Sequence, residues 1–160
     1  MREFDSTGSK LCSYQADIFS ASIEKLNCSS AIFLRRFYHS AFAAKLDDFH
    51  NHLFSFDIKD CFSQIDDEYG KSSYGNKKLP EPVLHWLGYI TRYICYTRDI
   101  SSKKFFKSFD LKLFIENYEV YHTQSEEWVI ERILELSNKN ENFFDKKNQT
   151  HEVLKKIWLL

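Results

Sequence analysis

The sequence predicts an all-α protein, a single compact domain of seven to eight helices around a central apolar helix at about residues 83–97. Three observations support this fold class. Only four glycines and two prolines occur in 160 residues, too few for the turns that an all-β sandwich or barrel needs every ~8–12 residues. Apolar residues make up 43% of the chain, enough for a core. These residues recur at helical rather than alternating spacing.

The first half of the chain predicts three helices. Residues 1–12 are polar and are expected to be frayed. Ser29 or Ser30 can cap the second helix by accepting a backbone N–H bond, and Gly70 is typical of a helix end. Residues 47–56 fit strand and helix equally and are expected to be irregular. Apolar spacing places the three helices at 14–26, 31–46 and 57–69.

Residues 71–82 contain both prolines and are predicted to link the two halves of a helical domain over 13–136. The next helix is apolar nearly all round, which is typical of a central element. Its Trp86, Ile90 and Ile94 are expected to be almost fully buried. Gly88 in its middle costs about 1 kcal/mol relative to Ala, a cost that is tolerable where another helix crosses closely.

The rest of the chain predicts shorter helices. Thr123 and Glu126 have the spacing of a capping box, which marks the start of a helix. Residues 137–160 are expected to be a polar segment followed by a C-terminal helix with an apolar tip. The expected helices of this half are 83–97, 102–109, 111–117, 125–136 and 150–160.

Charge and cysteine content bound the environment of the protein. The 22 basic and 23 acidic residues give a net charge of −1, so there is no bulk attraction to nucleic acid or to an anionic membrane. The N-terminus lacks the apolar core of a signal peptide, and the longest apolar stretch, 83–91, is about half of a ~20-residue membrane span. A cytoplasmic location is expected. The four cysteines lack any C-x-x-C pair and are expected to be reduced thiols.

Signals for catalysis are weak. The sequence contains no P-loop, G-x-S-x-G or G-x-G-x-x-G motif, and the acidic run 66–68 is typical of a solvated helix face. Asp47, Asp48, His50 and His52 are metal-ligand types, but the histidine spacing suits neither one helix face nor a zinc finger. We therefore expect no enzyme activity, no metal and no cofactor; an unrecognised hydrolase or transferase ranks third among the functions considered.

Arginines among apolar neighbours predict buried pairs, and a basic cluster offers an alternative function. One of Arg35 and Arg36, and also Arg92, can pair with an acid inside the protein. Two short helices separated by a tight turn are similar to a helix-turn-helix, although Phe105 and Phe106 favour packing over contact with phosphate. The alternative function is a helical DNA-binding transcriptional regulator. Its basic patch consists of Arg98, Lys103, Lys104 and Lys107.

Two segments resemble a known family. They read GYITRY at 88–93 and ENYEVYHTQSE at 116–126. This pattern, over about residues 88–136, resembles a family of small helical bacterial proteins that form a domain of unknown function. Its members are often encoded beside ADP-ribosyltransferase-like toxins. The resemblance implies a non-enzymatic protein-binding module, antitoxin-like or toxin-regulating, with an ADP-ribosyltransferase-like toxin as a candidate partner.

The aromatic content predicts where a partner would bind. With 17% aromatic residues, not all can be interior, and surface Tyr and Trp commonly anchor interfaces. If the loop before the helix at 125–136 folds back on the central helix, its side chains meet those near residue 96. The apolar tip at 157–160 is expected to pack on this chain or on another, so a homo-oligomer is one alternative. The expected partner-binding residues are Arg92, Tyr96, Arg98, Tyr121, His122 and Gln124.

Overall fold

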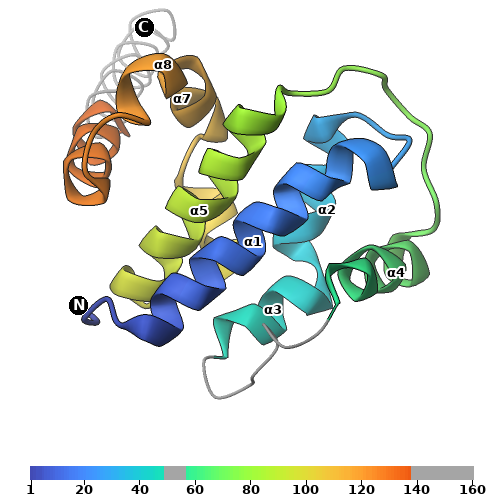
Figure 1. The fold of residues 1–160 in the computed structure, drawn as a ribbon, viewed down its shortest axis with the longest axis horizontal. Coiled ribbons are helices and arrows are strands. Elements are labelled where there is room, and N and C mark those ends of the chain that lie inside the picture. Colours follow the sequence, from blue (N-terminus) through green and yellow to red (C-terminus); the bar gives the residue numbers. More distant parts are fainter. Residues whose placement is uncertain (49–56, 138–160) are drawn as a thin grey trace, which may run out of the picture.

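Two long helices, α1 (Ser6–Lys25) and α5 (Glu81–Arg98), lie side by side through the middle of the structure (Figure 1). This computed structural model describes residues 1–48 and 57–137. Gly88 allows the two helices to approach, because a Cβ atom there would lie 2.8 Å from both the Ala16 Cα and the Gln15 carbonyl oxygen. The predicted central helix and its close crossing are confirmed, and α1 is the helix that crosses it.

The other helices flank this pair on two sides (Figure 1). One group packs on α1 and on one side of α5: α2 (Ser30–His39), α3 (Ala41–Asp47), α4 (Ile58–Tyr69) and α6 (Ser102–Ser108). The other group lies beyond α5: α7 (Leu111–Glu116), α8 (Tyr118–Tyr121) and a helix over 126–137. Across the described residues there is no strand and no helix long and apolar enough to cross a membrane.

The all-α prediction is confirmed, and the described residues hold nine helices. Seven to eight were predicted. The expected helix at 31–46 divides at Ser40, whose backbone is extended (ψ 154°) and whose hydroxyl accepts the Ala43 amide at 3.1 Å. The short α8 was not predicted. Because a capping side chain satisfies orphan amides, the chain can turn at Ser40 and begin a new helix directly.

The helix ends predicted at Ser29, Asp57 and Gly70 are confirmed. The Ser29 hydroxyl accepts the Ile32 amide at 3.3 Å, and the Asp57 carboxylate accepts the Lys59 amide at 3.0 Å. Gly70 ends α4 with a φ of 78°, which glycine adopts without a Cβ penalty. Residues 70–80 then run without regular structure to α5, close to the predicted linker at 71–82.

The prediction that residues 1–12 are frayed is wrong. α1 begins at Ser6, and the Asp5 carboxylate accepts the Gly8 amide at 2.9 Å. The Arg2 amide donates to the Thr97 carbonyl at 2.7 Å, and the Phe4 ring lies 4.6 Å from that of Tyr93. The N-terminus is ordered because α5, more than 80 residues further along the chain, supplies its partners.

Two further expectations are wrong in detail. The cap of the helix over 126–137 is Ser125, whose hydroxyl accepts the Trp128 amide at 3.3 Å, whereas the Thr123 hydroxyl donates to the Val120 carbonyl at the end of α8. Trp86 is half-buried at the edge of the core, beside the rings of Phe114 and Tyr118. Its neighbours on α5 at 90 and 94 are at most 1% exposed, as predicted. His50, His52 and the expected helix at 150–160 lie outside the described residues.

Candidate functional site

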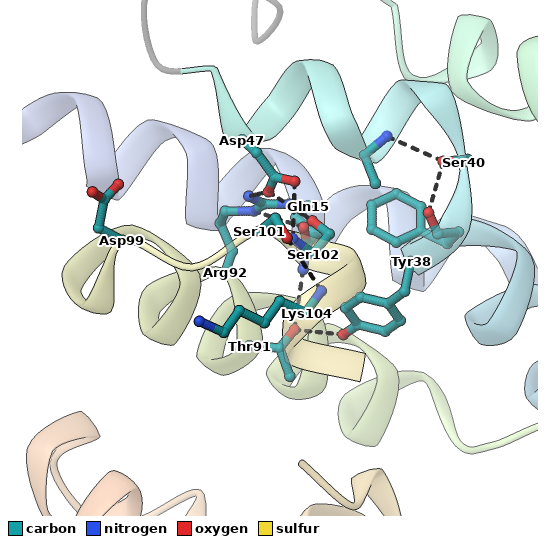
Figure 2. Close-up of polar contacts among 12 residues, drawn as sticks. Gln15, Tyr38, Ser40, Asp47, Thr91, Arg92, Asp99, Ser101, Ser102 and Lys104 are labelled. Atoms are coloured by element: carbon teal, nitrogen blue, oxygen red, sulfur yellow. Dashed lines mark hydrogen bonds and ion pairs between the residues drawn. The ribbon is translucent and has the colours of Figure 1, made fainter. Parts of the chain in front are cut away.

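A buried polar cluster joins four helices around Arg92, as Figure 2 shows. The Arg92 guanidinium on α5 donates to Gln15 Oε1 of α1, Asp47 Oδ1 of α3 and Ser102 Oγ of α6, each at 2.8 Å. Asp47 Oδ2 accepts the Ser102 amide at 2.9 Å, and Asp47 Oδ1 accepts the Ser102 hydroxyl at 2.8 Å. The prediction that Arg92 pairs with an acid inside the protein is confirmed.

The cluster continues along α5 through Thr91. Its hydroxyl donates to the Leu87 carbonyl at 2.7 Å and accepts from Tyr38 Oη at 2.7 Å and Gln15 Nε2 at 3.1 Å. Gln15 Nε2 also donates to the Gly88 carbonyl at 2.9 Å. In this series of hydrogen bonds, the side-chain donors of Gln15, Tyr38 and Thr91 each have an acceptor. A buried polar network needs such pairing if it is not to destabilise the fold.

The electrostatics of this cluster favour a structural role. Burial works to lower the pKa of the Arg92 guanidinium, but the charge and hydrogen bond of Asp47 help to raise it, and the net shift is upward. Burial raises the pKa of the Tyr38 hydroxyl, which therefore stays neutral. Arg92 and Thr91 are 0% exposed, so a substrate cannot reach them. The cluster fixes α1, α3, α5 and α6 relative to one another.

Three of the predicted partner-binding residues are interior, which removes their side chains from any surface. Arg92 is 0%, Tyr96 is 3% and Tyr121 is 7% exposed. The Tyr96 hydroxyl donates to Asp5 at 2.7 Å, whereas the Tyr121 ring packs edge-on against Trp128. The expectation that positions 96 and 121 meet is wrong, because α7 and α8 pack near the N-terminal half of α5 while Tyr96 lies at its other end, by the N-terminus (Figure 1).

The other three, Arg98, His122 and Gln124, are exposed and stay predicted contact residues. His122 is nevertheless engaged locally: its ring stacks 4.4 Å from that of Tyr118, and its Nδ1 lies 2.7 Å from the Tyr118 carbonyl. This contact gives the segment after α8 a defined shape.

The basic patch of Arg98, Lys103, Lys104 and Lys107 is exposed. The phenylalanines interleaved with it behave as predicted, since Phe105 is fully buried and Phe106 half-buried. The adjacent arginines of α2 differ from expectation: Arg35 is exposed, and Arg36 donates to the Gly70 carbonyl at 2.6 Å rather than to an acid.

Possible metal ligands and the cysteines are two further groups of side chains that could carry chemistry. In the described part of the chain, no group of three or more His, Cys, Asp or Glu residues could hold a metal ion. Burial raises the pKa of Cys12 and of Cys95 to about 12, so both are neutral thiols. The prediction of free cysteines is confirmed for all four.

An apolar groove of about 740 Å³ opens between α2, α6, α7 and the loop at 75–79. Its floor includes Leu34, and half-buried apolar side chains form its walls. Those walls are Leu79, Phe106, Phe109, Leu111 and Ile115. A cavity of this size lies within the ~300–1,000 Å³ of typical ligand sites.

Sequence reasoning missed this groove because its walls come from four separate segments. Two of them, the loop at 75–79 and α2, are brought together at Gly75, where a Cβ atom would lie 2.9 Å from the Ser29 side chain. Gly75 has a φ of 72°, and glycine in a Lys- and Asn-rich loop is the only local signal that this segment approaches another backbone closely.

Comparisons with protein-family models, with curated proteins and with solved structures find no match to this chain.

Proposed function

We propose that this protein is a non-enzymatic binding module that takes an amphipathic helix of a partner protein in the groove between α2, α6 and α7. The groove itself carries the proposal: it is about 740 Å³ in volume, and its apolar walls are only half-buried. Contiguous apolar surface left in contact with water is typical of sites of protein association, and apolar grooves are a recurring mode of helix recognition.

The hydrogen bonding of the groove favours a helix over an extended peptide. The Ser29 amide donates to the Tyr74 carbonyl at 3.0 Å, and the Ser30 amide donates to the Lys77 carbonyl at 3.1 Å. The Leu79 amide donates to Ser30 Oγ at 2.9 Å. Binding by strand addition needs unpaired backbone groups, which these bonds consume. A helix satisfies its own backbone and needs only apolar contact.

The charges on the rim favour a partner with a carboxylate beside its apolar stripe. Lys112 pairs with Glu116 at 3.6 Å, and the Asp110 carboxylate accepts the Lys112 amide at 3.0 Å. Lys77 is exposed and forms no ion pair with any residue that the structure describes. Complementary charge at a rim contributes mainly to specificity and association rate.

The finer form of the proposal is a bacterial antitoxin-like or toxin-regulating protein. Its support is the resemblance of residues 88–136 stated above. An ADP-ribosyltransferase-like toxin encoded beside the protein is therefore the first natural partner to test. The alternative, a DNA-binding regulator, is supported by the exposure of the basic patch at 98–107. Mobility shifts of duplex DNA at two salt concentrations test that alternative, because phosphate contacts weaken steeply with salt.

A designed peptide tests the groove directly. The probe is a fluorescent helical peptide with leucines at i, i+3, i+4 and i+7 and glutamates beside them, compared with a lysine-flanked copy by anisotropy. We expect the acidic peptide to bind more tightly, and Lys77→Glu to reverse that preference. Ala31→Arg in the groove should weaken binding at least tenfold. Val120→Arg is the matched control, since Val120 is 57% exposed on α8, away from the groove.

Three outcomes would contradict the partner helix. Equal loss of binding in Ala31→Arg and Val120→Arg would make the contact non-specific. A dimer of the wild-type chain that Ala31→Arg dissociates would assign the groove to a second copy. Tighter peptide binding in a full-length Trp158→Ala variant would assign the groove to the C-terminal segment of the same chain.

A further inference from the structure

A second hollow, of about 530 Å³, lies against a different set of α2 residues, together with the end of α4 and the loop at 70–80. Its α2 residues are Ile32, Arg35, Arg36 and His39. Their spacing of i, i+3, i+4 and i+7 places them on one face of the helix. Among the described residues, no acidic side chain lines this hollow. A face with two arginines and no lining carboxylate points to an anionic ligand.

The two arginines differ in how firmly they are held. Arg36 Nη1 donates to the Gly70 carbonyl at 2.6 Å, and the Arg36 guanidinium carbon lies 5.6 Å from the centre of the Tyr69 ring. Arg35 is exposed and forms no ion pair with a described residue. One guanidinium is thus preorganised and the other is free to close on a ligand. Such preorganisation lowers the entropy lost on binding.

The carboxylate of Glu68, the residue before Tyr69 on α4, is not part of the lining of the hollow. Glu68 Oε2 accepts the Ala41 amide at 3.0 Å at the start of α3. Burial, followed by the charge of Glu68, raises the pKa of Tyr69, so its ring stays neutral. With two arginines and no carboxylate among the described residues that line it, the hollow is positive.

Two aromatic rings in the lining of the hollow indicate which kind of anionic ligand it fits. Only four large apolar or aromatic side chains are strongly exposed in the described chain, and two of them, Tyr69 at 39% and Tyr74 at 77%, line this hollow. In sites that bind nucleotides, an exposed aromatic ring commonly stacks on the base while an arginine binds the phosphate. The Ser72 hydroxyl oxygen accepts the Tyr74 amide at 3.2 Å, which leaves its O–H to donate to a ligand.

We propose that this hollow binds a nucleoside phosphate, with the phosphate on Arg35 and Arg36 and the base on the ring of Tyr74. A volume of about 530 Å³ lies within the ~300–1,000 Å³ range of small-molecule sites. The site does not depend on the apolar groove, since it uses the opposite end of the 70–80 loop and other positions of α2. A nucleotide bound here would contact both α2 and the end of α4 and so tie them together.

Calorimetry with three probes tests the proposal: adenosine 5′-monophosphate, adenosine and inorganic phosphate. We expect the monophosphate to bind more tightly than either part. Arg35→Ala should weaken its binding at least tenfold, and Tyr74→Ala should reduce it to the level of phosphate while Tyr74→Phe retains it. Arg132→Ala is the matched control, an exposed arginine on the helix over 126–137 that does not line the hollow. Arg35 and Tyr74 are both exposed, so thermal melts should show these variants folded.

Each other outcome would overturn the proposal. No binding of the monophosphate to the wild-type chain removes the site. Equal affinity for the monophosphate and phosphate removes the base contact with Tyr74. Equal weakening by Arg132→Ala and Arg35→Ala shows general charge attraction, as does tight binding of a single-stranded oligonucleotide that both variants weaken alike.

Discussion

Arg92 Nη1 lies 2.8 Å from Asp47 Oδ1, and the Arg92 side chain has no exposed surface. Removing one partner of a buried ion pair costs ~3–5 kcal/mol because the other charge is left unpaired. Asp47 itself is 16% exposed, so we expect Asp47→Ala to lower the free energy of unfolding by about 3 kcal/mol. Urea denaturation measures this change. Asp67→Ala, at an exposed position on α4, is the control, and an equal effect of both substitutions would contradict a special role for the pair.

Gly88→Ala should destabilise the protein although alanine is the better helix former. A Cβ atom at position 88 would lie 2.8 Å from backbone atoms of Ala16 and Gln15 on α1. Backbone cannot move aside as a flexible side chain can, so we expect a loss of about 1–3 kcal/mol. His85→Ala, exposed on the same helix, should have little effect in the same denaturation experiment. A Gly88→Ala variant as stable as the wild type would show that α1 and α5 do not cross so closely.

Tyr121→Ala and His122→Ala should differ in their effect on stability. Tyr121 is 7% exposed and packs on Trp128, whereas His122 is exposed. We expect a clear fall in melting temperature for Tyr121→Ala and a change of at most a few degrees for His122→Ala. Ile94→Ala, at a position 0% exposed, should cost ~2–5 kcal/mol and gives the scale for a core residue. Equal melting temperatures for the variants at 121 and 122 would contradict the burial of Tyr121.

The carboxylate of Asp5 should make stability depend on pH. The Gly8 amide, and after it the Tyr96 hydroxyl, lowers the pKa of Asp5 below its usual 3.8. The ionised form is therefore favoured in the folded state, and its contribution is full above the unfolded pKa and lost as pH falls through the folded pKa. Asp5→Asn should lower stability at neutral pH, and its difference from wild type should shrink as the pH falls from neutral to below 3.8. Urea midpoints across this range measure it; a difference that stays constant would be inconsistent with these bonds.

All four cysteines should resist alkylation in the native protein. Each is at most 3% exposed, and burial raises the pKa values of Cys12 and Cys95 to about 12. The thiolate is the reactive form of cysteine, so we expect iodoacetamide to modify the native chain only as fast as it opens. Mass spectrometry should show four additions in urea. Rapid modification without denaturant would place at least one thiol at the surface.

The sequence predicted much of the local structure because its signals act over one or two helical turns. Apolar spacing located the central helix, and Ser29, Asp57 and Gly70 marked helix ends within two residues of those observed. Gly88 indicated a close helix crossing before its partner was known. At Ser40 a local cap was present but was hidden inside a continuous apolar pattern, so one predicted helix became α2 and α3.

Only the tertiary structure decided which side chains are buried and which sites exist. Arg92 meets Asp47 and Gln15 across separations of 45 and 77 residues, and no local pattern specifies which acid or amide an arginine will reach. Local patterns also failed for Tyr96 and Tyr121. Their aromatic character suggested that they lie at a binding surface, but both side chains are packed in the interior. The groove and the arginine-lined hollow arise where the 70–80 loop passes α2. Helical periodicity is set by neighbours along the chain, whereas burial and cavities depend on contacts between segments that only folding brings together.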